Sequence, residues 1–197
     1  MNREIELLRT DTHVFWGEIA PCNDPIRSYD NHPAFINSLE QYVADGLLSG
    51  ESVIIIATGA HLKLLNSKLK KRGLDPDHLA ITEKYFPIDV HETLSRFIVN
   101  GWPNDILFVE HLGAILTKAR KNSRVRAFGE MVALMWEKGN RGATLHLENL
   151  WRQFSKAESF CMICAYPKSG FTQDAVTSLH HISQTHSKVT TDFQNPS

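Results

Sequence analysis

The pattern of apolar and polar residues is clearest between residues 53 and 72. An unbroken apolar run at residues 53–57 is followed by a short turn and a basic-tailed amphipathic segment. A run of this length predicts a strand buried on both faces, as in a parallel sheet. Leucines at helical spacing predict a helix after the turn: Leu62, Leu65 and Leu69. Thr58 is suitably placed to cap this helix, and Gly59 allows a tight turn.

Strand-like and helix-like segments alternate along the rest of the chain. We expect further strands at residues 26–30, 84–87, 124–128 and 159–167, which makes five in total. We expect further helices at residues 33–47, 89–98, 106–120, 130–136, 143–154 and 173–181. This alternation predicts right-handed βαβ units. The expected fold is therefore α/β with three layers, in which helices cover both faces of a mostly parallel sheet.

The domain organisation that we expect is simple. Residues 1–25 form an N-terminal arm, residues 26–189 a single α/β domain, and residues 190–197 a flexible tail. Phe15 and Trp16 in the arm have two interpretations. They either lie against the domain or form a ligand lid or a dimer contact, because aromatic residues are enriched at interfaces.

Composition narrows the class of protein. The 197 residues carry a net charge of -1, with 42% hydrophobic and 22% charged residues. These values are ordinary for a globular protein and predict no direct binding to nucleic acid or to a membrane surface. No apolar run has the length of a membrane span, and the N-terminus is too charged for a secretory signal. Three cysteines do not make a disulfide framework, so we expect a cytoplasmic protein.

Ligands of parallel α/β sheets bind beyond the carboxyl ends of the strands, and this rule selects the candidate residues. The candidates at such ends are Tyr29, Asp30, Thr58, His61, Asp89 and Glu130. Glu130 is either a ligand contact or a carboxylate that stabilises the dipole of its own helix. His61 is either a neutral hydrogen-bonding group at the rim or a solvated surface residue. Tyr29, Asp30 and Asp89 are compatible with ligand contact and with plain capping.

Cys161 and Cys164 have the spacing of a redox or zinc motif, but they fall inside an apolar strand. Residues three apart on a strand face opposite sides of the sheet, and no second Cys or His pair completes a zinc site. We interpret both as buried structural cysteines and expect no metal site. His180 and His181 diverge around their predicted helix and do not change this expectation.

The turn after the strand at residues 53–57 has the position of a phosphate-binding loop without its chemistry. A P-loop requires a glycine-rich turn that ends in Gly-Lys-Ser/Thr, whereas residues 57–63 read Ala-Thr-Gly-Ala-His-Leu-Lys. No serine lies in a nucleophile elbow, and no paired carboxylates have a spacing that indicates acid–base chemistry. We therefore expect no catalytic residues and no cofactor.

Several stretches together resemble the MEDS family, the methanogen/methylotroph DcmR-type sensory domains. The most specific is Arg126-Ala-Phe-Gly-Glu-Met131 with the Trp136 and Trp151 that follow. The others are residues 16–18, 26–30, 50–58, 69–73, 147–151 and 164–167. The resemblance implies a RecA/KaiC-like fold that has lost its P-loop and serves sensing rather than ATP hydrolysis. It also implies a small organic ligand and an output through a histidine kinase or a transcription regulator.

We therefore expect a non-enzymatic sensory domain in signal transduction or transcriptional regulation. The ligand is expected at a rim formed by Tyr29, Thr58, His61 and Glu130, with its apolar part against Phe128 or Trp136. Two alternatives stay open: a divergent nucleotide-binding enzyme without the P-loop lysine, and a pure protein-interaction module. We also expect a homodimer, with Phe15, Trp16 and Trp102 as the candidate contacts.

Overall fold

A six-stranded sheet forms the centre of the protein. The computed structural model describes residues 14–18, 28–29, 32–121 and 123–167. The strands are β1 (Val14–Glu18), β2 (Ser28–Tyr29), β3 (Ser52–Ala57), β4 (Tyr85–Asp89), β7 (Val125–Gly129) and β8 (Cys161–Pro167). Their order is β2-β1-β8-β7-β3-β4, with β8, β7, β3 and β4 parallel and β1 antiparallel to both of its neighbours. The fold is thus α/β, built on four parallel strands.

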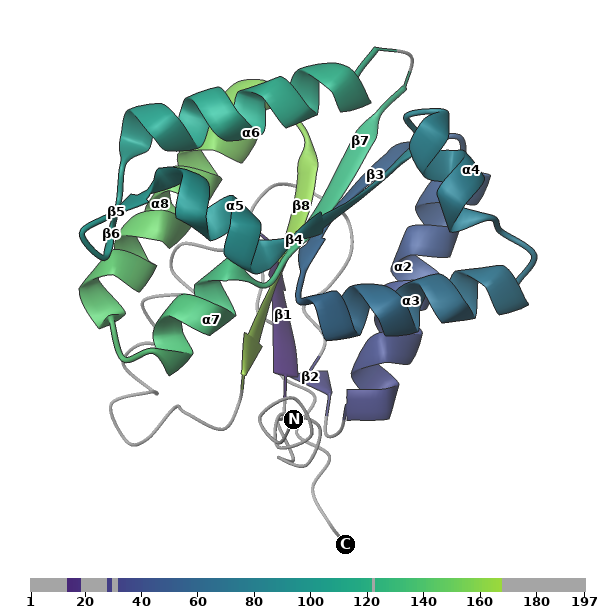
Figure 1. The fold of residues 1–197 in the computed structure, drawn as a ribbon, viewed down its shortest axis with the longest axis horizontal. Coiled ribbons are helices and arrows are strands. Elements are labelled where there is room, and N and C mark those ends of the chain that lie inside the picture. Colours follow the sequence, from purple (N-terminus) through teal and green to yellow (C-terminus); the bar gives the residue numbers. More distant parts are fainter. Residues whose placement is uncertain (1–13, 19–27, 30–31, 122, 168–197) are drawn as a thin grey trace, which may run out of the picture.

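Helices cover both faces of this sheet (Figure 1). One face carries α2 (His32–Leu48), α3 (Gly59–Lys71) and α4 (Pro76–Ile81). The other carries α5 (Val90–Phe97), α6 (Asp105–Ala119), α7 (Met131–Glu137) and α8 (Arg141–Glu158). A small hairpin of β5 (Ile98–Val99) and β6 (Trp102–Pro103) connects α5 to α6. None of the described helices combines the length and apolarity that a membrane span requires.

The central strand β3 is buried on both faces, as its apolar run predicts. Val53 and Ile55 point into the core beneath α2 and α3. Ile54 and Ile56 point into the opposite core, which is covered by α5 to α8. Successive side chains of a strand face opposite sides, so one apolar run serves two cores.

The larger of the two cores is centred on an aromatic cluster. Phe108 of α6 is fully buried and makes edge-to-face contacts with three rings, with centroid distances of 5.2 Å to Phe97, 5.1 Å to Trp151 and 5.7 Å to Phe154. Edge-to-face geometry places the positive edge of one ring against the negative face of the next. The cluster therefore joins α5, α6 and α8 into one layer.

On the other face, a single arginine joins α2 to the sheet. The guanidinium of Arg126 on β7 is ion-paired with Glu51, donates a 3.0 Å hydrogen bond to the backbone oxygen of Tyr42 and lies 4.8 Å from the centre of the Tyr42 ring. Gly46 makes room for it, because a Cβ there would lie 2.7 Å from Cδ of Arg126. Arg126 of the conspicuous Arg-Ala-Phe-Gly-Glu segment thus has a structural role.

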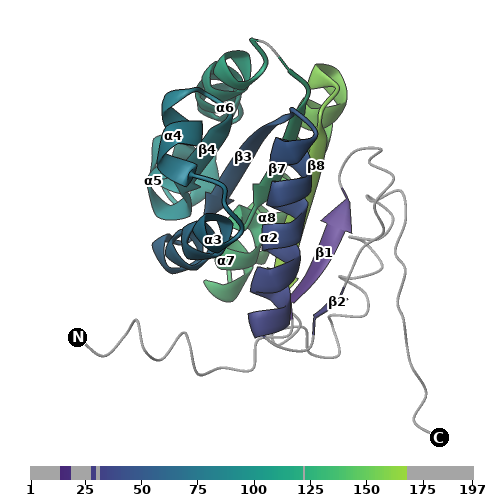
Figure 2. The ribbon, with the colours of Figure 1, turned by 90° about the vertical axis from the view of Figure 1, so that its right-hand side faces the viewer.

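The predicted strands at residues 53–57, 84–87, 124–128 and 159–167 are confirmed to within two residues at each end as β3, β4, β7 and β8. The prediction of five strands is wrong, because β1 pairs along its whole length with β8 and adds a sixth (Figure 2). Phe15 and Trp16 are therefore residues of a sheet strand. The short helix α4 and the β5–β6 hairpin were not predicted, since each is too short for a periodic pattern. The predicted helix at residues 173–181 and the tail at residues 190–197 lie outside the described residues.

Candidate functional site

The site begins where β3 ends and α3 starts. Thr58 caps α3 as predicted, and its hydroxyl accepts a hydrogen bond from the backbone N–H of His61 at 3.3 Å. The cap places His61 in the first turn of α3, directly beyond the carboxyl end of the central strand. This is the edge of a parallel sheet at which ligands bind.

Glu130 follows the neighbouring strand β7 and lies at the same edge. Its backbone N–H donates to the carbonyl of Ile56 at 3.0 Å, which holds the two strand ends together. Only 4% of the residue is exposed. The carboxylate makes no capping hydrogen bond to its own helix α7. Instead it accepts a hydrogen bond from the backbone N–H of Thr58 at 2.9 Å and is paired with Nδ1 of His61.

These contacts place a carboxylate of the chain itself at the N-terminus of α3. The free N–H groups and the dipole of a helix N-terminus favour an anion, and nucleotide-binding proteins place a phosphate there. In this chain the carboxylate of Glu130 supplies the negative charge at Thr58. Glu130 is a residue of the site, and its partners belong to α3 rather than to its own helix.

A second histidine extends the cluster. His32, the first residue of α2, has its Nε2 atom 2.9 Å from Nε2 of His61. The two rings lie 5.0 Å apart over the buried Phe35, which is 5.3 Å from the His61 ring. A hydrogen bond between two Nε2 atoms requires that one carries a proton and the other does not. The chain Glu130–His61–His32 therefore holds one proton between its two imidazoles.

The electrostatics of the cluster separate its two histidines. Burial disfavours the charged form of His61, but the charge of Glu130, its hydrogen bond and a smaller contribution from Glu137 outweigh burial and raise the pKa of His61 above 6.5. Burial and then the nearby His61 lower the pKa of His32, which the charge of Glu130 only partly opposes. When His61 is charged, it therefore donates from Nε2 to a neutral His32.

These shifts predict a pH-dependent stability. A histidine whose pKa is raised by folding stabilises the protein fully below its unfolded pKa of about 6.5, and the stabilisation is lost as the pH rises through the folded pKa. The lowered pKa of His32 has the opposite effect on the pH dependence of stability. We therefore remove it from the comparison by measuring His32→Gln against the double variant His32→Gln/His61→Gln. The single variant should have the higher free energy of unfolding below about pH 6, and its advantage should shrink towards about pH 8.5. Urea unfolding at a series of pH values measures this difference, and an advantage that grows with pH would contradict the assignment.

Two aromatic candidates lie away from the rim itself. Phe128 on β7 is fully buried, with its ring 6.0 Å from that of Phe35. It thus contacts the histidine cluster through Phe35, whose ring also lies against His61. Trp136, near the end of α7, is 9% exposed, and the guanidinium of Arg141 lies 5.5 Å from the centre of its ring. Of the six predicted site residues, the structure brings Thr58, His61 and Glu130 into direct contact.

Tyr29 ends β2 at the same edge of the sheet, since it pairs with Val14, and Val14 pairs with Pro167 at the carboxyl end of β8. In the strand order, however, β2 lies three strands from β7, roughly 14 Å away. The side chain of Tyr29 and the whole of Asp30 lie outside the described residues.

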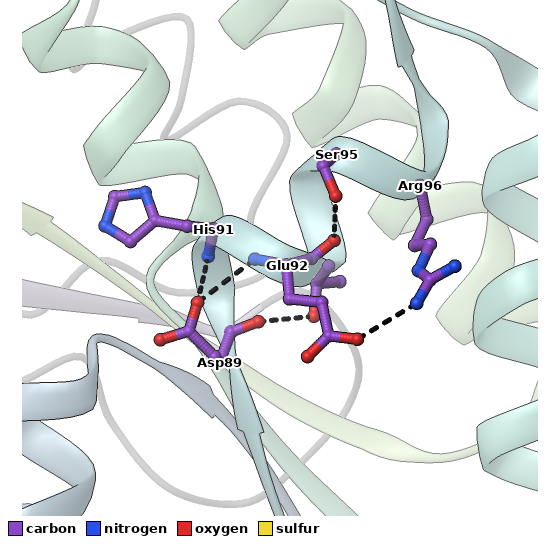
Figure 3. Close-up of polar contacts among 6 residues, drawn as sticks. Asp89, His91, Glu92, Ser95 and Arg96 are labelled. Atoms are coloured by element: carbon purple, nitrogen blue, oxygen red, sulfur yellow. Dashed lines mark hydrogen bonds and ion pairs between the residues drawn. The ribbon is translucent and has the colours of Figure 1, made fainter.

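Asp89 ends β4 and caps the next helix (Figure 3). Its carboxylate accepts hydrogen bonds from the backbone N–H groups of His91 at 2.8 Å and Glu92 at 3.0 Å. Its carbonyl accepts from the hydroxyl of Thr93 at 2.8 Å. Of the two interpretations of Asp89, these contacts support helix capping.

Cys161 and Cys164 face opposite sides of β8, as their spacing predicts. Cys164 is a buried free thiol in the core under α5 to α8, and burial raises its pKa. Cys161 is half-buried, with its sulfur 3.8 Å from the hydroxyl of Tyr42, and it is disulfide-bonded. It is therefore not the simple buried thiol that we expected. Within the described ranges, no three His, Cys, Asp or Glu side chains are grouped to hold a metal ion.

His32 is the residue of the cluster that sequence reasoning missed. It directly precedes Pro33, at the start of an amphipathic helix, and one weak signal was therefore present. A helix that starts next to the carboxyl edge of the sheet presents its first residues to the crevice. Nothing local in the sequence pairs His32 with a residue 29 positions away.

The fold and the site together define a class of protein. It is an α/β protein with the strand–turn–helix geometry of a nucleotide site, in which a carboxylate of the chain itself lies at the helix N-terminus. Residues 27–187 match the family model described as MEDS, "MEthanogen/methylotroph, DcmR Sensory domain". The chain belongs to this family of sensory domains, which implies a role in sensing or signalling. No curated protein and no solved structure matches it.

Proposed function

We propose that this chain is a non-enzymatic sensory domain whose small organic ligand binds at the rim formed by Thr58, His61, Glu130 and His32. The observation that carries the proposal is the buried Glu130 carboxylate, which is held by the N–H of Thr58 and by His61 at the carboxyl edge of the sheet. A buried charge at such an edge is a common feature of binding sites.

The hydrogen bond between the two histidines has a direction, with one imidazole as donor and the other as acceptor. When His61 is charged, the Nε2 atom of His32 accepts its hydrogen bond, and the half-buried His61 lies between His32 and Glu130. A ligand with a polar head can exchange hydrogen bonds with the outer imidazole and shift the proton along the chain. Because His32 and His61 belong to α2 and α3, and Glu130 joins β7 to α7, a change in their contacts would reach several elements of the fold.

The parallel strands and the β3–α3 turn support a RecA/KaiC-like ancestry with a degenerate P-loop. In this role, binding of the ligand to the domain would change the activity of a histidine kinase or a transcription regulator. Native mass spectrometry of freshly purified protein tests the ligand proposal directly. A retained small molecule that is lost in Glu130→Gln would support it. A retained molecule that is unaffected by changes at Glu130, His61 and His32 would place the ligand elsewhere.

The alternative of a divergent nucleotide-binding enzyme predicts a different outcome. A phosphate at the N-terminus of α3 would have to displace the carboxylate of Glu130 or lie against it. Lys63, the nearest lysine of this turn in the sequence, lines a groove between α3 and α5. We therefore expect no binding of Mg-ATP and no ATP turnover.

A thermal-shift assay measures this expectation. A ligand at one hundred times its dissociation constant adds about 2.7 kcal/mol to the free energy of unfolding. Millimolar Mg-ATP should leave the melting temperature unchanged relative to magnesium alone. A clear rise, together with released phosphate, would favour the enzyme.

We also propose self-association through the hairpin side of the molecule. Trp102 is 49% exposed, and its ring stacks on His146 with a centroid distance of 5.6 Å. Leu145, which precedes His146, and Ile106, which follows the His146 partner Asp105, are exposed as well. Exposed aromatic residues of this kind are enriched in interface cores. Light scattering should give twice the chain mass of 22.3 kDa, and Trp102→Ser should return it to that of a monomer. A monomer at high micromolar concentration would exclude a stable dimer.

A further inference from the structure

A cavity lies apart from the histidine cluster, between α5, the β5–β6 hairpin and the end of α7. Its volume is about 500 Å³, which is within the range of roughly 300–1,000 Å³ typical of small-molecule sites. We call it the α5–α7 cavity. Its wall at the hairpin is fixed by Asn140, whose side-chain amide donates a 2.7 Å hydrogen bond to the carbonyl of Gly101. Gly101 has φ +77°, a conformation that favours glycine.

The inner surface of this cavity is apolar. Leu94 of α5 and Met135 of α7 are 6% and 5% exposed, and both belong to the larger core. Ile98 packs against the same core and completes this side of the lining. A ligand that fills the cavity would therefore cover the outer surface of the hydrophobic core with apolar atoms, which is favourable in proportion to the area covered.

The rim of the cavity carries two basic side chains. His91 and Lys138 both line it and are both exposed. Lys138 makes no ion pair with any residue that the structure describes. The His91 ring extends away from the hydrogen-bonded network of its neighbours (Figure 3).

The acidic groups nearest in the sequence are already engaged. Asp89 caps α5, and Glu92 is paired with Arg96 at 3.0 Å. Glu137, which directly precedes Lys138, interacts electrostatically with His61 of the histidine cluster. None of the described residues that line the cavity is acidic, whereas Lys138 is positively charged, so an anion is the complementary ligand.

We propose that the α5–α7 cavity binds a small carboxylate with an apolar body, its tail against Leu94 and Met135 and its carboxylate at Lys138. Met135 belongs to α7, which begins directly after Glu130, and Lys138 is the C-cap residue of the same helix. The helix thus connects this cavity to the histidine cluster. The binding proposal does not depend on a ligand at that cluster.

Hexanoate is a suitable probe. Acetate, which lacks the apolar tail, and 1-hexanol, which lacks the charge, are the matched controls. Calorimetry on the full chain should show saturable hexanoate binding in the millimolar range, as expected for a ligand of this size. Acetate and 1-hexanol should both bind more weakly. Lys138→Gln should weaken hexanoate about two- to fivefold, because the ion pair is exposed, and should leave 1-hexanol unchanged. Lys63 lies in the separate groove between α3 and α5, so Lys63→Gln should change the binding of neither hexanoate nor 1-hexanol.

Met135→Trp should fill the cavity and abolish binding of both hexanoate and 1-hexanol. If this variant does not fold, the Met135 methyl resonance of the wild type, assigned with Met135→Leu, replaces it and should shift on addition of hexanoate. Absence of saturable hexanoate binding would overturn the proposal. So would hexanoate binding that neither moves the Met135 methyl resonance nor responds to Lys138→Gln.

Discussion

Replacing Phe108 with alanine should lower the free energy of unfolding by about 3–5 kcal/mol, the largest effect that we expect from a single change in the core. The residue is fully buried at the centre of the aromatic cluster. Its loss removes three edge-to-face contacts and leaves a cavity between α5, α6 and α8 that rigid neighbours cannot fill. Denaturant unfolding with an unchanged m-value measures the loss.

Two variants control this experiment. Phe108→Leu keeps most of the buried volume, and its cost should be clearly smaller. Val109→Ala changes the next residue of α6, which is 50% exposed, and should stay within about 0.5 kcal/mol of the wild type. A loss below about 1.5 kcal/mol for Phe108→Ala would show that α6 does not pack as described.

Replacing Glu130 with alanine should cost about 3–5 kcal/mol below pH 7, because it leaves the partly buried His61 charge and the N–H of Thr58 without their acceptor. Glu130→Gln keeps the shape and one acceptor oxygen, and should cost about 1–3 kcal/mol. The neutral side chain also removes the attraction that keeps His61 charged. Burial then dominates, and the pKa of His61 should fall below 6.5.

Urea unfolding measures the stability, and an NMR titration of the His61 ring measures its pKa. Glu110→Gln, an exposed carboxylate on α6, is the matched control and should stay within about 0.5 kcal/mol. The double variant Glu130→Gln/His61→Gln should lose less than the sum of the single variants, since the two side chains share one interaction. Additive losses, or a His61 pKa that does not move in Glu130→Gln, would exclude the pairing.

These results bear on the proposed function, because they test whether the polar groups of the candidate site are held in place. A carboxylate that only complemented the dipole of α7 would cost a few tenths of a kcal/mol when neutralised. A much larger loss would identify Glu130 as part of a preorganised polar cluster. A ligand for the site would then bind to groups that are already positioned, which reduces the entropy cost of binding.

Much of this arrangement could be predicted from the sequence. The apolar run before Thr58 can only be accommodated where both faces of a strand are covered, which implies a parallel sheet with helices on both sides. The carboxyl ends of parallel strands share one edge, so Thr58, His61 and Glu130 were expected at the same rim. The cap at Thr58 depends on a residue three positions away, and such local hydrogen bonds follow from residue type and spacing.

Only the tertiary structure decided how the side chains at that rim are paired. A glutamate directly before a helix can turn towards the N–H groups of that helix or towards a neighbour, and the packing of β3 against β7 brings Thr58 within reach of Glu130. His32 meets His61 because α2 packs beside α3, and no local pattern encodes a contact between residues so far apart. The strand β1 likewise gains its hydrogen bonds only from β8 and β2, so its five residues did not appear as a strand in the sequence. Local residue patterns determined the elements and the edge of the sheet at which the site lies, whereas long-range packing determined which polar groups meet there.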